Sequence, residues 1–233
     1  MGIYKSRTEA GKRIVEFILE QNSEFYTQIL NNQEDFFCYC IPNGGVSVAE
    51  GFCSRLNLYY DIIIVRKIKI PYNTEAGFGS ITTDGTILMN KTLLSQLNLS
   101  EDSIRNSIEI TKSEINERLE FYGKKNNITD IYEHNIKNRN VFIIDDGLAS
   151  GFTMLAAIKM IKKYNPVKIF ITVPTAPLRT INFIKNEVDE VFCPNIRDTA
   201  WFAVADAYVN WYDVPESEVI DIIHNSNHYK IEI

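Results

Sequence analysis

The stretch that decides the fold is VFIIDDGLASGFTM, residues 141–154. Its first four residues, 141–144, are apolar and predict a short buried strand, while the run 153–164 has the apolar spacing of a helix. Between the two lie adjacent carboxylates, Asp145 and Asp146, followed by a short turn that contains glycine. The sequence therefore predicts a strand–loop–helix unit with an acidic pair at the carboxyl end of the strand.

The loop of this unit has the chemistry of an anion site. Backbone N–H groups in such a loop and at the start of a helix bind anions, and the hydroxyls of Ser150 and Thr153 add hydrogen-bond donors. The carboxylates would repel a phosphate, but ionised Asp accepts hydrogen bonds from sugar hydroxyls. We therefore predict a sugar phosphate, with its diol on Asp145 and Asp146 and its phosphate in the loop 149–153.

Three other interpretations of the unit are weighed. A plain βα turn in which an Asp caps the helix stays open. A P-loop is excluded because no Gly-Lys-Ser/Thr ends the loop. A dinucleotide-binding fingerprint is excluded because GxGxxG is absent and the acidic pair precedes the glycines.

Residues 141–154 resemble the 5-phosphoribosyl 1-pyrophosphate (PRPP) motif of type I phosphoribosyltransferases. Four further segments, 7–11, 41–49, 65–79 and 114–122, look like a largely uncharacterised group of predicted phosphoribosyltransferases, so the resemblance covers most of the chain. It implies transfer of the phosphoribosyl group of PRPP to a nitrogen acceptor, expected to be a nucleobase. Pyrophosphate would be released, and Mg²⁺ would neutralise its charge.

The resemblance also implies the site residues. The catalytic residues would be Asp145, Asp146 and Lys67. The substrate would be bound by Asp145, Asp146, Gly147, Ala149, Ser150, Gly151, Phe152, Thr153, Asn43, Gly44, Gly45, Arg66 and Lys67. The second loop, 42–45, reads Pro-Asn-Gly-Gly where that group usually has Pro-Arg-Gly-Gly, which removes a positive charge.

Three of these assignments keep a competing interpretation. Gly44 and Gly45 fit a pyrophosphate loop, but also a tight turn without a ligand. Arg66 and Lys67 could meet the leaving pyrophosphate or could be a solvated strand end. Ala149 excludes proton transfer at that position and leaves the acceptor unidentified. A PRPP- or nucleotide-sensing regulator without transfer activity, and a sugar phosphate hydrolase, are therefore the alternative functions.

The rest of the chain alternates strands with helices. We expect strands at 36–41, 60–65, 141–144, 167–173 and 190–193, and helices at 6–22, 46–56, 103–122, 153–164, 178–186 and 217–224. This order predicts an α/β fold, a mostly parallel sheet flanked by helices. Residues 1–233 would form a single phosphoribosyltransferase-like domain. Residues 66–90 would be a flap of loop and short strands, and 194–233 a small hood.

Two details of these helical and tail segments are expected to be structural. Glu114 and Arg118 lie four residues apart on a helix and would form an exposed ion pair. Trp201, Phe202 and Trp211 are expected to pack in the core, rather than to stack on a base.

The composition of the chain limits the kinds of partner that we expect it to bind. The chain has 233 residues, of which 45% are hydrophobic and 23% charged, and a net charge of −6, which argues against nucleic-acid binding. No run of ~18 apolar residues predicts a membrane helix. The cysteines form no CxxC pair, so we expect free thiols in the cytoplasm and no metal site built by the protein alone. The expected assembly is a homodimer. The cysteines are Cys38, Cys40, Cys53 and Cys193.

Overall fold

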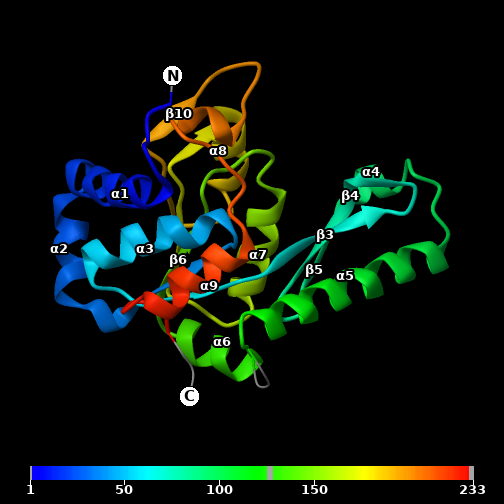
Figure 1. Ribbon diagram of the computed structural model, residues 1–233, viewed down its shortest axis with the longest axis horizontal. Helices are drawn as coiled ribbons and strands as arrows, with labels where there is room; N and C mark the ends of the chain where they lie inside the picture. The colour runs from blue at the N-terminus through cyan, green and yellow to red at the C-terminus, as the bar shows by residue number, and fades with distance from the viewer. Residues whose placement is uncertain (1, 125–127, 231–233) are drawn as a thin grey trace.

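The computed structural model describes residues 2–124 and 128–230, and its centre is a parallel sheet (Figure 1). The five strands follow the order β2-β1-β6-β7-β9, and every neighbouring pair is parallel. Their bounds are β1 (Phe36–Cys40), β2 (Tyr60–Ile62), β6 (Asn140–Ile144), β7 (Lys168–Thr172) and β9 (Glu190–Phe192). The predicted α/β class is confirmed.

Helices cover both faces of this sheet, which is why its inner strands are apolar on both sides. Alternate residues of β1 and β6 point to opposite faces: Phe36 and Phe142 pack with α1, α2 and α3, whereas Phe37 and Ile143 pack with α6, α7 and α8. The helices are α1 (Arg7–Gln21), α2 (Ser23–Asn31), α3 (Gly44–Leu56), α6 (Ile128–Ile136), α7 (Phe152–Lys162) and α8 (Leu178–Ile184).

A second sheet projects from the core with the longest helix along it (Figure 1). It is antiparallel, in the order β3-β4-β5, and together with α4 and α5 it forms what we call the arm. Buried Ile68, Phe78 and Ile115 hold its sheet and helix together. The bounds are β3 (Val65–Ile70), β4 (Asn73–Thr82), β5 (Ile87–Met89), α4 (Lys91–Leu94) and α5 (Glu101–Phe121).

The C-terminal part adds a short parallel pair, β10 beside β8, and then runs back along the molecule. Tyr208 pairs with Tyr4 through an isolated bridge, so this segment also closes over the N-terminus. Its elements are β8 (Thr175–Pro177), β10 (Asn195–Arg197), the 3₁₀ turn η2 (Val204–Ala207) and α9 (Glu216–Asn225); the other 3₁₀ turn, η1 (Gln33–Asp35), precedes β1.

Several local expectations were wrong. The predicted strand 60–65 is two strands, β2 and the start of β3, because the chain leaves the central sheet after Ile62. Residues 66–90 were expected to hold loop and short strands; they do hold strands, of which β4 (Asn73–Thr82) is longer than expected. Helices α2 and α6 were not predicted. Trp201 is 92% exposed and Trp211 39% exposed, so neither packs in the core.

Among the described helices, none has the length and apolar character needed to cross a bilayer.

Candidate functional site

The acidic pair lies at the carboxyl edge of the central sheet, directly after β6. Asp145 donates its N–H to Thr172 O at 3.4 Å, and its Oδ1 accepts the N–H of Asp146 at 2.8 Å. The neighbouring strand β1 leads into the loop that carries Asn43 and Gly44, so the structure brings the two predicted loops together.

Burial and mutual repulsion govern the charge of this pair. Burial, and then the charge of Asp146, raise the pKa of Asp145 well above the ordinary range of an Asp. Burial also raises the pKa of Asp146, but the guanidinium of Arg7 opposes that shift. Asp145 is therefore the carboxyl of the pair that is harder to ionise.

Arg7 lies in segment 7–11, one of the segments that carry the resemblance, and the structure places its side chain against the acidic pair. Its Nε lies 2.8 Å from Asp146 Oδ2, its Nη2 donates to Tyr212 O at 3.0 Å, and the side chain is only 6% exposed. The rings of Tyr208, Trp211 and Tyr212 surround its guanidinium, that of Trp211 at 4.2 Å. In the sequence, Arg7 was marked by the resemblance of segment 7–11 and by its place near the start of a predicted helix, but neither feature pointed to Asp146.

The loop after the acidic pair carries several backbone N–H groups that have no acceptor among the described residues. Within the described chain, no group accepts a hydrogen bond from the N–H of Gly147, Ala149, Ser150, Gly151 or Thr153. Ala149, Ser150 and Thr153 are exposed, and Gly151 has a left-handed backbone (φ 77°) just before α7 begins. Of the remaining loop amides, Leu148 donates to Thr175 O and Phe152 to Ser150 Oγ. This is the arrangement that binds a phosphate at a helix start.

The second loop packs directly on the acidic pair. The Pro42–Asn43 peptide bond is cis. The N–H groups of Asn43 and Gly44 have no acceptor among the described residues, whereas Gly45 donates to Ile41 O at 3.2 Å. A Cβ on Gly44 would lie 1.9 Å from Asp146 Oδ2, so only glycine permits this contact.

The side chain of Asn43 joins this loop to the arm and the tail. Its Nδ2 donates to Val214 O at 2.7 Å, and its Oδ1 accepts from Arg118 Nη1 at 3.0 Å. Arg118 also pairs with Glu216 at 2.5 Å, whereas Glu114 pairs with Lys69 at 2.7 Å. The expected pair between Glu114 and Arg118 is therefore wrong, because each side chain finds a partner outside its own helix.

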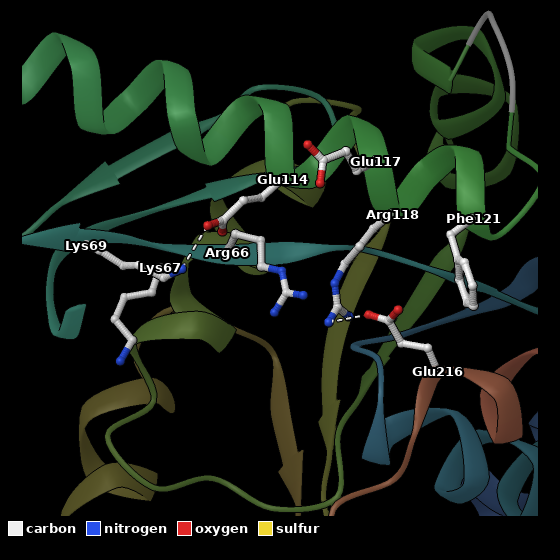
Figure 2. A pocket seen from close by; sticks show the side chains of 8 residues that line it. All are labelled: Arg66, Lys67, Lys69, Glu114, Glu117, Arg118, Phe121 and Glu216. Carbon is white, nitrogen blue, oxygen red and sulfur yellow. Dashed lines mark hydrogen bonds and ion pairs between the residues drawn. The ribbon is translucent and has the colours of Figure 1, made fainter.

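Arg66 and Lys67 line a cavity of about 540 Å³ under the arm (Figure 2). Both residues belong to β3, not to the end of the second central strand as expected. Lys67 Nζ donates to Glu75 O at 2.5 Å, and the buried Nε of Arg66 has no partner within the described chain. The cavity is lined by Arg66, Lys67, Lys69, Glu114, Glu117, Arg118, Phe121 and Glu216, and it does not include the residues of the loop after β6.

Comparison with known proteins shows the family to which this domain belongs. The family model described as the phosphoribosyl transferase domain matches residues 7–209. Two Mycobacterium tuberculosis proteins, of strains CDC 1551 and H37Rv, bear phosphoribosyl transferase names; each is 23% identical over 227 residues, 97% of this chain and 48% of the relative. This chain thus spans about half the length of those curated relatives.

A solved structure shows the same fold. The crystal structure of a protein from Thermus thermophilus covers 94% of this chain and 97% of its own, with a TM-score of 0.71 and 23% identity. The family match extends over most of the chain and includes both loops and the acidic pair. The chain therefore belongs to the phosphoribosyl transferase domain family.

Proposed function

We propose that this protein transfers the 5-phosphoribosyl group of PRPP to a nitrogen acceptor and releases pyrophosphate. The acceptor we propose is a nucleobase. The observation that carries this proposal is the set of unpaired amides in the loop from Gly147 to Thr153, next to the paired carboxylates at the end of β6. An anion site and a diol site side by side match a ribose phosphate.

In this proposal each loop holds one part of the donor. The amides of the loop after β6 bind the 5′-phosphate, with the hydroxyls of Ser150 and Thr153. Asp145 and Asp146 accept hydrogen bonds from the ribose hydroxyls; apart from Arg7 and the N–H of Asp146, no other described residue donates to this pair. The free amides of Asn43 and Gly44 face the pyrophosphate.

The reaction then breaks one bond and forms another at the anomeric carbon. The bond from that carbon to pyrophosphate breaks with its electron pair on the leaving oxygen. The acceptor nitrogen forms the new bond with its lone pair, and its proton passes to water. Cations stabilise the leaving group, for which Arg66 and Lys67 under the arm are the candidates. In this proposal residues 66–90 are the flap that excludes water, and the tail 194–233, of which the structure describes 194–230, is the hood over the acceptor.

Mg²⁺ fits this site through its donor set. It prefers hard oxygen ligands and keeps several waters, and the site offers two carboxylates rather than a protein cage. PRPP oxygens and water would hold it, with Asp145 as the neighbouring carboxylate. When bound, it would neutralise charge on the departing pyrophosphate.

The test is pyrophosphate release from Mg-PRPP with a panel of nucleobases and simple amines. Release that depends on one acceptor class is the expected result, and it identifies that acceptor. PRPP binding without release for any acceptor would reject transfer and favour the sensing role. Hydrolysis that no acceptor accelerates would favour a hydrolase.

A further inference from the structure

The loop that faces the proposed pyrophosphate has no free side chain of its own. Both polar atoms of the Asn43 side chain are occupied: Nδ2 by Val214 O, and Oδ1 by Arg118 at 3.0 Å and Tyr122 at 3.4 Å. Only the N–H groups of Asn43 and Gly44 remain open. A charge that stabilises an anion at this loop must therefore come from another element.

Two cations border this loop: Arg7, whose guanidinium is held by Asp146 and Tyr212 O, and Arg118 of α5, which contacts Asn43. The Nη1 of Arg118 donates to Asn43 while its Nη2 reaches Glu216, and the side chain is 20% exposed. Figure 2 shows the guanidinium groups of Arg66 and Arg118 pointing into the same cavity, with Glu216 meeting Arg118 at its edge. The cavity thus adjoins the loop through Arg118.

The charges of the cavity leave an excess of cations. Lys69 is neutralised by Glu114 and Arg118 by Glu216, while no described carboxylate pairs with Arg66 or Lys67. Glu117 is the one lining carboxylate without a cationic partner in the described chain; it accepts from Ser113 Oγ at 3.3 Å. Two unpaired cations against one carboxylate favour an anionic ligand.

We propose that Arg118 binds the pyrophosphate group and that Glu216 occupies Arg118 in its absence. Glu216, the first residue of α9, acts as a competing carboxylate: the incoming anion displaces it, and Arg118 then adds its charge to the loop amides. This inference rests on the proposed function, because it assigns the pyrophosphate end of the donor. It predicts that loss of the Arg118 charge weakens pyrophosphate binding and that loss of the Glu216 charge strengthens it.

The experiment is calorimetric titration of inorganic pyrophosphate into the whole protein and its variants. Arg118→Gln should weaken binding by roughly tenfold to a hundredfold, as loss of a charge-assisted hydrogen bond does. Glu216→Gln should tighten it by about two- to fivefold, the strength of a partly exposed ion pair. The double variant should match Arg118→Gln, because Glu216 acts only through Arg118.

Two matched variants separate this role from general electrostatics. Arg105→Gln removes a cation from the same helix that pairs only with Asp102 at the surface, and it should leave the affinity unchanged. Glu114→Gln removes a carboxylate from the same cavity, but one paired with Lys69, so it should tighten binding less than Glu216→Gln does.

Four results would overturn the proposal: no pyrophosphate binding by the unmodified protein, unchanged affinity in Arg118→Gln, weaker binding in Glu216→Gln, or equal tightening in Glu114→Gln. If Arg118→Gln does not fold, Glu216→Gln still tests the proposal, because the Glu216 side chain is 36% exposed and its replacement should raise the affinity for pyrophosphate. Pyrophosphate binding with these signs, but without turnover of PRPP, would reject the proposed function and keep this inference. Turnover of PRPP, together with unchanged pyrophosphate affinity in Arg118→Gln, would support the proposed function and reject this inference.

Discussion

Arg7 Nε lies 2.8 Å from Asp146 Oδ2, and this contact joins the first helix to the acidic pair across the sheet edge. Both side chains are largely buried, 6% and 16% exposed. The rings of Tyr208 and Trp211 fix the guanidinium from the tail side. The ionised state of Asp146 therefore depends on a residue 139 positions away in sequence.

Removal of Arg7 should leave Asp146 as an uncompensated buried charge. We expect Arg7→Gln to lower the free energy of unfolding by about 3 kcal/mol at neutral pH, as loss of one partner of a buried ion pair does. Urea denaturation measures this. Adding Asp146→Asn should restore part of the loss, because the stranded charge disappears. A loss no larger than that of Arg13→Gln, whose pair with Glu20 is exposed, would contradict the argument.

The acidic pair itself should control PRPP affinity. Asp145→Asn with Asp146→Asn should weaken PRPP binding strongly and leave the far-ultraviolet circular dichroism unchanged, because both residues lie at a strand end. Fluorescence or calorimetric titration with Mg-PRPP measures the dissociation constant. An unchanged constant would reject the assignment of the ribose hydroxyls to this pair.

The raised pKa of Asp145 adds a pH dependence to PRPP binding. Its ionised form accepts the hydroxyl, so affinity should fall on acidification at a higher pH than an ordinary Asp would give. The Asp145→Asn variant should lack this step in the pH profile. A step that persists in the variant would belong to another group.

The predicted strand–loop–helix unit is confirmed because its evidence is local. The apolar run, the acidic pair and the glycine turn are contiguous, so neighbouring residues alone determine the path of the chain there. The arm shows the opposite case. Gly77 and Gly79 favour a loop by composition, yet both lie in β4. There they allow close packing, because a Cβ would meet Lys67 or Leu88 on the adjacent strands.

Contacts between distant segments explain what the sequence did not reveal about the site. Arg118 was expected to pair with Glu114 one helical turn away, but it contacts Asn43 and Glu216, which are 75 and 98 positions away. Nothing in the local pattern distinguishes these outcomes. The same holds for Arg7, whose partner Asp146 becomes its neighbour only when the sheet forms.

Thr153 should contribute a hydrogen bond to the 5′-phosphate. Its side chain is exposed at the start of α7, and its N–H is among the unpaired amides. Thr153→Val keeps the shape but removes the hydroxyl, so PRPP binding should weaken by roughly 1–3 kcal/mol. Titration with PRPP and with ribose 5-phosphate measures it. An unaffected dissociation constant for both ligands would place the phosphate elsewhere.

Gly44 should tolerate no side chain. A Cβ would lie 1.9 Å from Asp146 Oδ2 and 3.0 Å from Arg7 Nε, so Gly44→Ala must displace Asp146. We expect PRPP affinity to fall at least tenfold. Gly85→Ala is the control, since no atom lies within 4 Å of its Cβ position and its cost is only the strain of its positive φ. Equal PRPP affinity in the two variants would show that Asp146 is not needed in its present position.

Asp84 should give the arm a stability that depends on pH. Its Oδ2 lies 2.8 Å from Lys163 Nζ and accepts from Tyr164 OH at 3.0 Å, and its side chain is 1% exposed. Burial raises the pKa of Asp84, but the hydrogen bonds from Lys163, Thr86 and Thr82 outweigh it and lower that pKa to about 2. These contacts tie the turn between β4 and β5 to the end of α7.

The lowered pKa of Asp84 determines how its contribution to stability changes with pH. The ordinary pKa of an Asp, 3.8, applies to the unfolded chain, so Asp84 stabilises the fold above that pH and loses its contribution as the pH falls through about 2. The full contribution is about 2 kcal/mol at neutral pH. Urea denaturation of the protein and of Asp84→Asn between pH 7 and pH 2 should show a difference that is constant down to about pH 4 and then shrinks. A difference that does not change over this range would mean that the carboxylate charge is not what holds the turn.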